Sequence, residues 1–364
     1  MKKDVLFILK DDGNEGSNNS ARKLVELITS KSKNARILYL TKDSSKPLLF
    51  KENGSIYLNH PRLRKRNFLS SVFSIVKNLN NLTYFFYSLR KRKVVVNNAT
   101  LLDILIVSLI TKHETFVFLR ETHLPTLFLF VIKLLSKFTG LKVLSNNCAI
   151  KNQIEGVNIS VVNNYVDLHD QGVDLSPCKD RIRILSVGSI YPLKNQIALV
   201  ELAKSLLGIV NFKIDIYGSV IDEAYHMEVK NLISQYGLDE YISIKGQISN
   251  DKLMIEYSKY HVFIQASSFE GMSRALMDAL SIGQYCIATD VGDTNRLLID
   301  SCGLLVSKNF DREDIESIKN KLRFIQAEPS LVASDVYRAR ENIRINFSYQ
   351  SCIKQLEMVN LIEL

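Results

Sequence analysis

The fold is decided by residues 267–293, which read SSFEGMSRALMDALSIGQYCIATDVGD. A strand is predicted over 261–265, a polar loop with Glu270 and Gly271 follows it, and a helix is predicted over 273–281. Gly271 lets a ligand approach the backbone closely, and the amides at the start of a helix favour an anion such as a diphosphate. The stretch therefore predicts a strand–loop–helix unit whose loop binds an anionic group.

The same alternation extends outward from this stretch in both directions. In the second half we predict further strands at 183–187, 213–217, 242–244 and 286–288, and helices at 195–206, 223–236, 250–257 and 295–298. In the first half we predict strands at 5–9, 35–40, 93–96, 116–119, 142–144 and 159–162, a polar loop at 11–19, and helices at 20–31, 101–109 and 127–138. Short apolar strands alternating with helices are typical of parallel sheets covered on both faces.

Residues 167–181 interrupt this pattern, because they are polar, aperiodic and contain Gly172 and Pro177. We therefore expect an α/β protein with two Rossmann-like domains facing each other across a cleft, and ligand at the carboxyl ends of the strands. The expected divisions are a first domain at 1–170, a linker at 171–181, a second domain at 182–345 and a C-terminal helix at 346–364 that returns to the first domain.

Composition limits the class of protein. A length of 364 residues suits two domains, and the five cysteines are scattered without a CxxC pair, which excludes a disulfide scaffold and a zinc ribbon. The apolar runs are shorter than the ~20 residues that a membrane-spanning helix needs. The N-terminus, MKKDVLFILKDDG, has too short an apolar stretch for a signal peptide. We expect a cytoplasmic protein.

The charge is unevenly distributed. Residues 1–180 have 27 Lys and Arg against 15 Asp and Glu, whereas residues 181–364 have 20 against 23. The excess is densest at two clusters, Arg62, Arg64, Lys65 and Arg66, and Arg90, Lys91, Arg92 and Lys93, which flank apolar residues at helical spacing over 68–79. Such a segment can lie on an anionic membrane surface, or it can be an amphipathic helix packed on its own domain. We expect no nucleic-acid partner, because no binding motif is present and the second half is acidic.

Two further residues indicate a ligand with both hydroxyl groups and an anionic part. Asp278 follows Glu270 by eight positions, which is close to two helical turns, so the two carboxylates can accept hydrogen bonds from separate hydroxyl groups of one ligand. Lys194 follows the predicted strand 183–187 and precedes a helix, where it adds a cation. Taken singly, residues of these types in such positions are more often solvated surface groups.

The order of motifs in the second half resembles the family 4 glycosyltransferases of GT-B architecture, also grouped as glycosyl transferases group 1. The motifs are SVGSIYPLK at 186–194, IDIYGS at 214–219, YISIKGQIS at 241–249, the stretch from His261 to Gly283, and ATDVGD at 288–293. In the first half EGSNNSARKLVELI, VFLRETHLP, VLSNNCAIK and ISVVNNYVD resemble the family more loosely. The resemblance implies transfer of a sugar from a nucleotide donor to a hydroxyl group with retention.

The resemblance also implies roles for individual residues. Glu270 is the first acid of a Glu-x7-Glu motif and contacts the donor sugar, and Asp278 stands where the second acid binds the ribose. Lys194 neutralises the donor diphosphate, and His123 lies near the reacting carbon. The implied donor site also includes Gly188, Ser189, Gly218, Gln247, Ile248, Gly271, Met272, Ser273 and Arg274, and the implied acceptor side Gly16, Ser17 and Asn18.

Two positions depart from the family pattern. Asp278 is one methylene shorter than the usual glutamate, and Ser189 replaces the arginine that normally follows the strand-end glycine. Arg274 is positioned in the sequence to replace that counter-charge. No metal is expected, since there is no Asp-x-Asp and no His/Cys cluster with ligand spacing.

We expect no cofactor other than the nucleotide-sugar substrate, with UDP favoured over GDP. The expected acceptor is a glycan or lipid-linked glycan of cell-surface polysaccharide synthesis at the inner face of the membrane. The alternatives are another GT-B enzyme such as a sugar-nucleotide epimerase, and a non-catalytic nucleotide-sugar-binding subunit of a synthase complex, which Ser189 and Asp278 favour.

Overall fold

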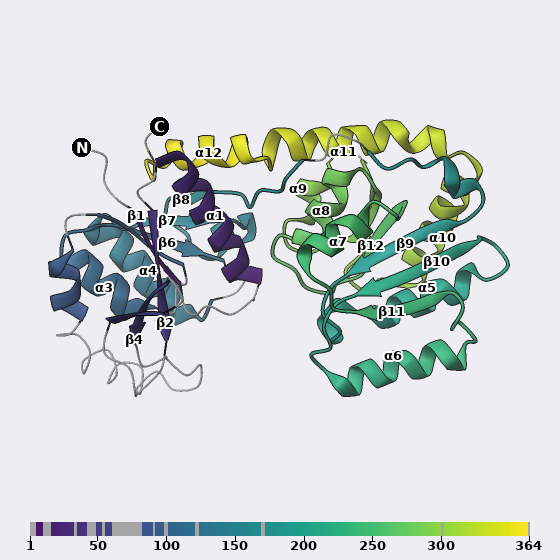
Figure 1. The fold of residues 1–364 in the computed structure, drawn as a ribbon, viewed down its shortest axis with the longest axis horizontal. Helices are drawn as coiled ribbons and strands as arrows, with labels where there is room; N and C mark the ends of the chain where they lie inside the picture. Colours follow the sequence, from purple (N-terminus) through teal and green to yellow (C-terminus); the bar gives the residue numbers. More distant parts are fainter. Residues whose placement is uncertain are drawn as a thin grey trace. The chain divides into compact units, whose positions relative to one another are not determined.

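The structure is a computed structural model that describes residues 5–9, 16–32, 35–41, 49–52, 55–59, 82–89, 92–97, 101–120, 124–168, 172–299 and 302–362. The chain divides into two compact α/β units (Figure 1). The first unit is Met1–Asn164 together with Cys352–Leu364, and the second is Tyr165–Ser351. In this division the second unit includes residues 171–181, the expected linker, where Ser176–Lys179 form a 3-10 turn, η2.

Within its described residues, the first unit contains an eight-stranded sheet in which only β3 and β4 pair antiparallel. In spatial order its strands are β3 (Leu49–Glu52), β4 (Ser55–Asn59), β2 (Ala35–Thr41), β1 (Val5–Leu9), β5 (Lys93–Val96), β6 (Glu114–Leu119), β7 (Lys142–Ser145) and β8 (Ile159–Val161). Its helical elements are α1 (Gly16–Ser32), residues 82–88, α3 (Leu102–Ile110), α4 (Thr126–Thr139) and the 3-10 turn η1 (Cys148–Gln153).

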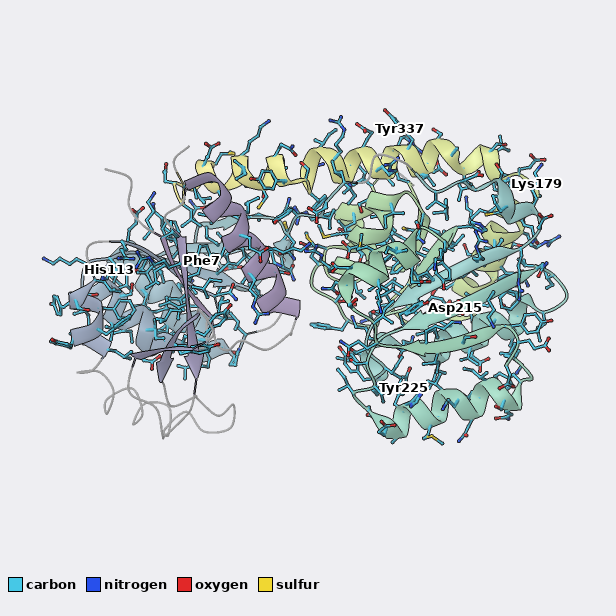
Figure 2. All side chains as sticks on the ribbon, viewed as in Figure 1. Phe7, His113, Lys179, Asp215, Tyr225 and Tyr337 are labelled. Carbon is cyan, nitrogen blue, oxygen red and sulfur yellow. The ribbon has the colours of Figure 1, made fainter. Side chains whose placement is uncertain are left out.

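Helices cover both faces of this sheet, because side chains alternate along each strand. Leu6 and Ile8 of β1 pack in one apolar cluster with residues of the 82–88 helix, α3 and α4. Leu9 of the same strand packs on the opposite face with Ala21 of α1. Figure 2 labels Phe7, which is also buried in β1. The predicted parallel sheet with two covered faces is therefore confirmed for this unit.

The second unit contains a six-stranded, fully parallel sheet. In spatial order its strands are β11 (Ile242–Gly246), β10 (Phe212–Tyr217), β9 (Ile182–Val187), β12 (Val262–Gln265), β13 (Tyr285–Thr289) and β14 (Leu304–Val306). Its helical elements are η3 (Pro192–Lys194), α5 (Gln196–Leu206), α6 (Glu223–Gln235), α7 (Asn250–Tyr257), α8 (Arg274–Ile282), α9 (Thr294–Leu297), α10 (Arg312–Ala327), η4 (Pro329–Val332) and α11 (Ala333–Asn346).

The helices of the second unit are distributed over both faces of its sheet. One apolar cluster joins alternate strand residues such as Ile184 and Ile214 to α5, α6 and α10. The other joins Leu185 and Phe263 to α7, α8, α9 and α11. Figure 2 labels Asp215 on β10 and Tyr337 on α11, where the Tyr337 side chain is exposed.

The C-terminal helix α12 (Tyr349–Met358) begins in the second unit, and its residues from Cys352 onward belong to the first. Within the first unit, the side-chain oxygen of Gln355 accepts a hydrogen bond from the Asn163 amide at 2.7 Å. The expected domain boundaries and the expected return of this helix remain predictions.

Two expectations about the first half need correction. Lys93 is not part of an exposed cationic cluster: its side chain is 4% exposed and its Nζ donates to the carbonyl of Asn360 at 2.7 Å, because Lys93 begins a central strand. The predicted polar loop at 11–19 is also too long, since α1 already begins at Gly16. The cluster of Arg62, Arg64, Lys65 and Arg66, the pair Arg90 and Lys91, and the apolar segment 68–79 lie outside the described residues.

Candidate functional site

Strand order in the second unit creates a place where a ligand can bind. The strands that follow β9 in sequence, β10 and β11, lie on one side of it, whereas β12, β13 and β14 lie on the other. The helices after β9 and β12, α5 and α8, accordingly pack on opposite faces of the sheet. Loops that diverge in this way leave a crevice at the carboxyl ends of the two strands, which is where open α/β sheets bind ligands.

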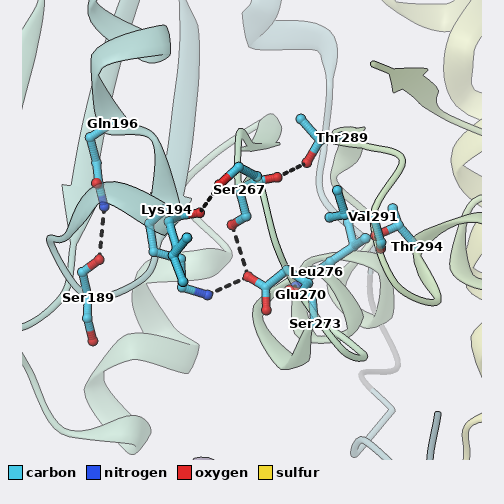
Figure 3. Close-up of polar contacts among 12 residues, drawn as sticks. Ser189, Lys194, Gln196, Ser267, Glu270, Ser273, Leu276, Thr289, Val291 and Thr294 are labelled. Atoms are coloured by element: carbon cyan, nitrogen blue, oxygen red, sulfur yellow. Dashed lines mark hydrogen bonds and ion pairs between the residues drawn. The ribbon is translucent and has the colours of Figure 1, made fainter. Parts of the chain in front are cut away.

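Lys194 and Glu270 meet at this point. Lys194 follows β9 and Glu270 follows β12, and the Lys194 ammonium forms an ion pair with Oε1 of Glu270 (Figure 3). The Lys194 and Glu270 side chains are 22% and 15% exposed, so both are partly shielded from water. The structure thus brings together the two charged residues that the sequence singled out in separate loops.

The Glu270 loop is held by hydrogen bonds from buried side chains and from the loop after β13. The Ser267 hydroxyl donates to Oε1 of Glu270 at 2.9 Å, and the Thr289 hydroxyl donates to the Ser267 carbonyl at 2.5 Å (Figure 3). Ser267 and Thr289 are both buried. The Asp293 amide donates to the carbonyl of Gly271 at 2.8 Å, which ties the Glu270 loop to the loop after β13. The carboxylate is therefore held in one orientation before any ligand arrives.

Gly292 allows these two loops to approach each other. An added Cβ at Gly292 would lie 2.2 Å from the Gly271 carbonyl oxygen and 2.3 Å from that of Glu270, and its φ is +58°. We expect Gly292→Ala to lower the free energy of unfolding by roughly 3 kcal/mol or more, from left-handed strain plus overlap. Gly237→Ala is the matched control, because Gly237 has φ +65° with nothing within 4 Å of its Cβ position.

Gly237→Ala should lower the free energy of unfolding by only roughly 1–2 kcal/mol, because it adds left-handed strain without overlap. Urea unfolding of both variants measures the difference. If both variants lose the same free energy of unfolding, the loops after β12 and β13 do not approach each other as closely as the structure describes.

Gly188 and Gly218 allow close packing beside Lys194. A Cβ at Gly188 would lie 3.3 Å from Cδ of Lys194, so the lysine stem passes directly over this glycine. A Cβ at Gly218 would lie 2.0 Å from the Gly188 carbonyl oxygen, so the loops after β9 and β10 touch through their backbones. Ser189 follows Gly188: its backbone carbonyl accepts a hydrogen bond from the side-chain amide of Gln196 at 3.0 Å, and its hydroxyl oxygen lies 3.3 Å from that of Ser219.

Helix α8 begins beside the Glu270 loop. The Ser273 hydroxyl caps it by accepting from the Leu276 amide at 3.3 Å. Nε of Arg274 lies 3.5 Å from Oδ1 of Asp278, one turn further along. Asp278, one of the two departures from the family pattern, is therefore ion-paired with Arg274, the residue expected to compensate for the other departure, Ser189.

The other predicted site residues are placed as follows. Gln247 and Ile248 follow β11 at the same sheet edge, where Gln247 is exposed and Ile248 is partly buried against the core, and Met272 is buried in the core before α8. Gly16, Ser17 and Asn18 form the first turn of α1 in the first unit. His123 lies outside the described residues.

Sequence reasoning did not assign a role to Ser267, Thr289 or Gly292. All three lie in the stretch that decides the fold, but their function depends on the contact between the loops after β12 and β13. The signal available in the sequence is the position of each residue at the carboxyl end of a predicted strand. Among the described residues, no group of three or more His, Cys, Asp or Glu side chains is placed to hold a metal ion.

No helix within the described ranges is both long and apolar enough to cross a membrane.

Comparison with solved structures shows the fold. The chain is similar to HepE from Anabaena in complex with UDP, with a TM-score of 0.76 and 16% identity over 99% of this chain and 100% of that chain. It is also similar to sucrose-phosphate synthase from Thermosynechococcus elongatus, with a TM-score of 0.74 and 16% identity over 99% and 98%. The predicted GT-B fold, two Rossmann-like α/β domains in one chain, is confirmed.

Sequence comparison gives a local match to a curated protein. Over 103 residues the chain is 30% identical to the UDP-N-acetylglucosamine–peptide N-acetylglucosaminyltransferase GtfA subunit of Streptococcus pneumoniae. That match covers 28% of this chain and 19% of the streptococcal protein, so the chain spans about a fifth of its length. Residues 174–341, which include Lys194, Glu270 and the whole six-stranded sheet, match the family model of the glycosyl transferases group 1.

Proposed function

We propose that the protein is a glycosyltransferase of family 4 that moves a sugar from a nucleoside diphosphate donor to a hydroxyl group of a glycan or lipid-linked glycan. The observation that supports this most strongly is the meeting of Lys194 and Glu270 at the carboxyl ends of β9 and β12, inside the region that matches the group 1 model. A cation and a fixed carboxylate at this point suit a ligand with an anionic part beside hydroxyl groups.

The chemistry follows from where charge develops. As the bond between the anomeric carbon and the diphosphate breaks, the leaving diphosphate gains negative charge. Lys194 and the amides at the start of α8 stabilise that charge, and they do so more in the transition state than in the ground state. Glu270 accepts hydrogen bonds from sugar hydroxyls. In this scheme His123 is near the reacting carbon, and the reaction retains configuration and needs no metal.

Arg274 supplies the second positive charge that Ser189 cannot. Its guanidinium lies in the first turn of α8, where the helix amides already favour an anion. In this scheme the ion pair with Asp278 orients Arg274, and the Asp278 carboxylate accepts hydrogen bonds from the ribose hydroxyls. Gly188, Gly218, Gln247 and Ile248 complete the donor site, with the last two on the nucleobase side.

The remaining parts of the proposal concern substrate and place. UDP is the favoured nucleotide, and support comes from similar proteins whose descriptions name UDP. The acceptor binds at the first unit, on the side of Gly16, Ser17 and Asn18. The protein acts in cell-surface polysaccharide synthesis in the cytoplasm, peripherally at an anionic membrane surface.

Product analysis with a panel of UDP-, GDP- and other nucleotide sugars tests this function. We expect one UDP-sugar to release UDP slowly in water and faster with a glycan acceptor.

Ser189 and Asp278 favour a second candidate function, that of a non-catalytic nucleotide-sugar-binding subunit of a synthase complex. That candidate predicts nucleotide-sugar binding with no release from any donor, alone or with acceptor.

A further inference from the structure

Helix α4 is apolar on both of its faces. Toward the sheet, Ile132 is fully buried, and Phe128 and Leu135 pack against the core of the first unit. The opposite face presents a row of large apolar side chains that we call the outer stripe: Leu127, Phe130, Leu134 and Phe138, which are 40%, 58%, 40% and 73% exposed. A helix on the surface of a domain normally has a polar outer face, so this stripe indicates a surface that something else covers.

The charges of α4 indicate what covers it. The helix contains no Asp or Glu. Its two lysines, Lys133 and Lys137, are both exposed, and the Lys137 ammonium lies 5.6 Å from the ring centroid of Phe138. Lysines beside an apolar stripe can extend their ammonium groups toward anionic headgroups while the apolar side chains enter the acyl region.

A second segment on this face of the sheet has the same character. Leu82 and Phe86 pack in the core cluster that includes Ile132 of α4, so the 82–88 helix covers the same face of the sheet. Tyr84 and Tyr87 on this segment are 80% and 67% exposed. Exposed tyrosines are favoured at the boundary between water and lipid, because the ring is apolar and the hydroxyl is polar.

We propose that the outer stripe of α4 docks the first unit onto an anionic phospholipid bilayer. The helix has 14 residues, too few to cross a bilayer, so it lies in the plane of the interface. Docking against a second copy of the chain is disfavoured, since a two-fold contact of this face with itself would bring Lys133 and Lys137 near their own symmetry mates. Because α4 follows β6, Leu127 lies near the carboxyl edge of the sheet, and the stripe runs away from that ligand-binding edge.

The docking surface rests on the proposed function in one respect: its role would be to bring a lipid-linked acceptor to the protein.

The test uses the full chain and vesicles of phosphatidylglycerol and phosphatidylcholine, with pure phosphatidylcholine vesicles as the neutral control. We expect the chain to sediment with the anionic vesicles, and we expect F130Q/F138Q to weaken this binding roughly tenfold or more, because two exposed rings no longer enter the lipid. K133S/K137S should weaken binding to anionic vesicles and remove its dependence on salt.

The matched control is I221Q/I255Q, which changes two exposed apolar residues of the second unit, 67% and 63% exposed. It should bind vesicles as the unchanged chain does. Circular dichroism checks that each variant is folded. Three results would overturn the inference: no vesicle binding by the unchanged chain, equal binding by F130Q/F138Q, or a dimer in solution that this variant converts to monomer.

The docking surface and the proposed sugar transfer fail separately. UDP binding, measured by calorimetry, should be the same in F130Q/F138Q and in the unchanged chain, because the stripe is in the first unit. Loss of vesicle binding with intact UDP binding supports the docking surface. Vesicle binding by a chain that releases nucleotide from no donor would leave the docking surface standing and contradict the proposed enzyme.

Discussion

Glu270→Gln should reduce turnover of the preferred nucleotide-sugar by about 10²-fold, which corresponds to the loss of charge-assisted hydrogen bonds. The carboxylate accepts from the Ser267 hydroxyl and pairs with the Lys194 ammonium, so its position is fixed and only its charge changes in the variant. Initial rates of nucleotide release with saturating acceptor measure the effect. We expect the change in kcat rather than in KM, because the contact strengthens as the bond breaks.

The matched control is Glu341→Gln. Glu341 lies on α11 of the same unit and is ion-paired with Arg344 at 2.6 Å, so this variant also replaces a paired carboxylate. It should keep full turnover. Equal rates in Glu270→Gln and Glu341→Gln would remove Glu270 from the reaction.

Lys194→Ala should lower kcat/KM for the donor by about 10²-fold, since it removes a cation from the developing diphosphate charge. It should also weaken binding of UDP, because UDP presents the same diphosphate in the ground state. Lys194→Arg should recover part of the lost kcat/KM and part of the lost UDP affinity, because it restores the positive charge in a group of different shape.

Lys319→Ala serves as the control for a paired lysine, because Lys319 on α10 is ion-paired with Glu316 outside the site. It should leave UDP affinity unchanged. The assignment of Lys194 fails if Lys194→Ala and Lys319→Ala bind UDP equally well, with both variants folded by circular dichroism.

Most of the fold could be predicted from the sequence because each βα repeat is locally encoded. The strand before Gly188 and the strand before Glu270 are apolar runs that end in turn residues, and the structure places β9 and β12 there. The β3–β4 hairpin was missed, although the Asn53-Gly54 pair between Leu49–Glu52 and Ser55–Asn59 is a hairpin signal. The strand β14, Leu304–Val306, was also missed.

The charged centre of the site could be predicted only in part. Lys194 and Glu270 were identified from separate motifs, but their direct ion pair depends on the adjacency of β9 and β12, which is a long-range property of the sheet. The contact between Gly292 and the Glu270 loop is long-range in the same sense. Lys93 was misassigned because a basic run reads as exposed, whereas the strand that begins there buries it.

The central claim is that the crevice at the carboxyl ends of β9 and β12 binds a nucleoside diphosphate through Lys194. Calorimetric titration of the full chain with UDP and with uridine tests it most directly. We predict saturable heat with UDP, affinity for uridine weaker by at least about tenfold, since the charge-assisted contacts to the diphosphate are absent, and weaker UDP binding in Lys194→Ala. No heat with UDP or GDP, or equal affinity for uridine and UDP, would contradict it.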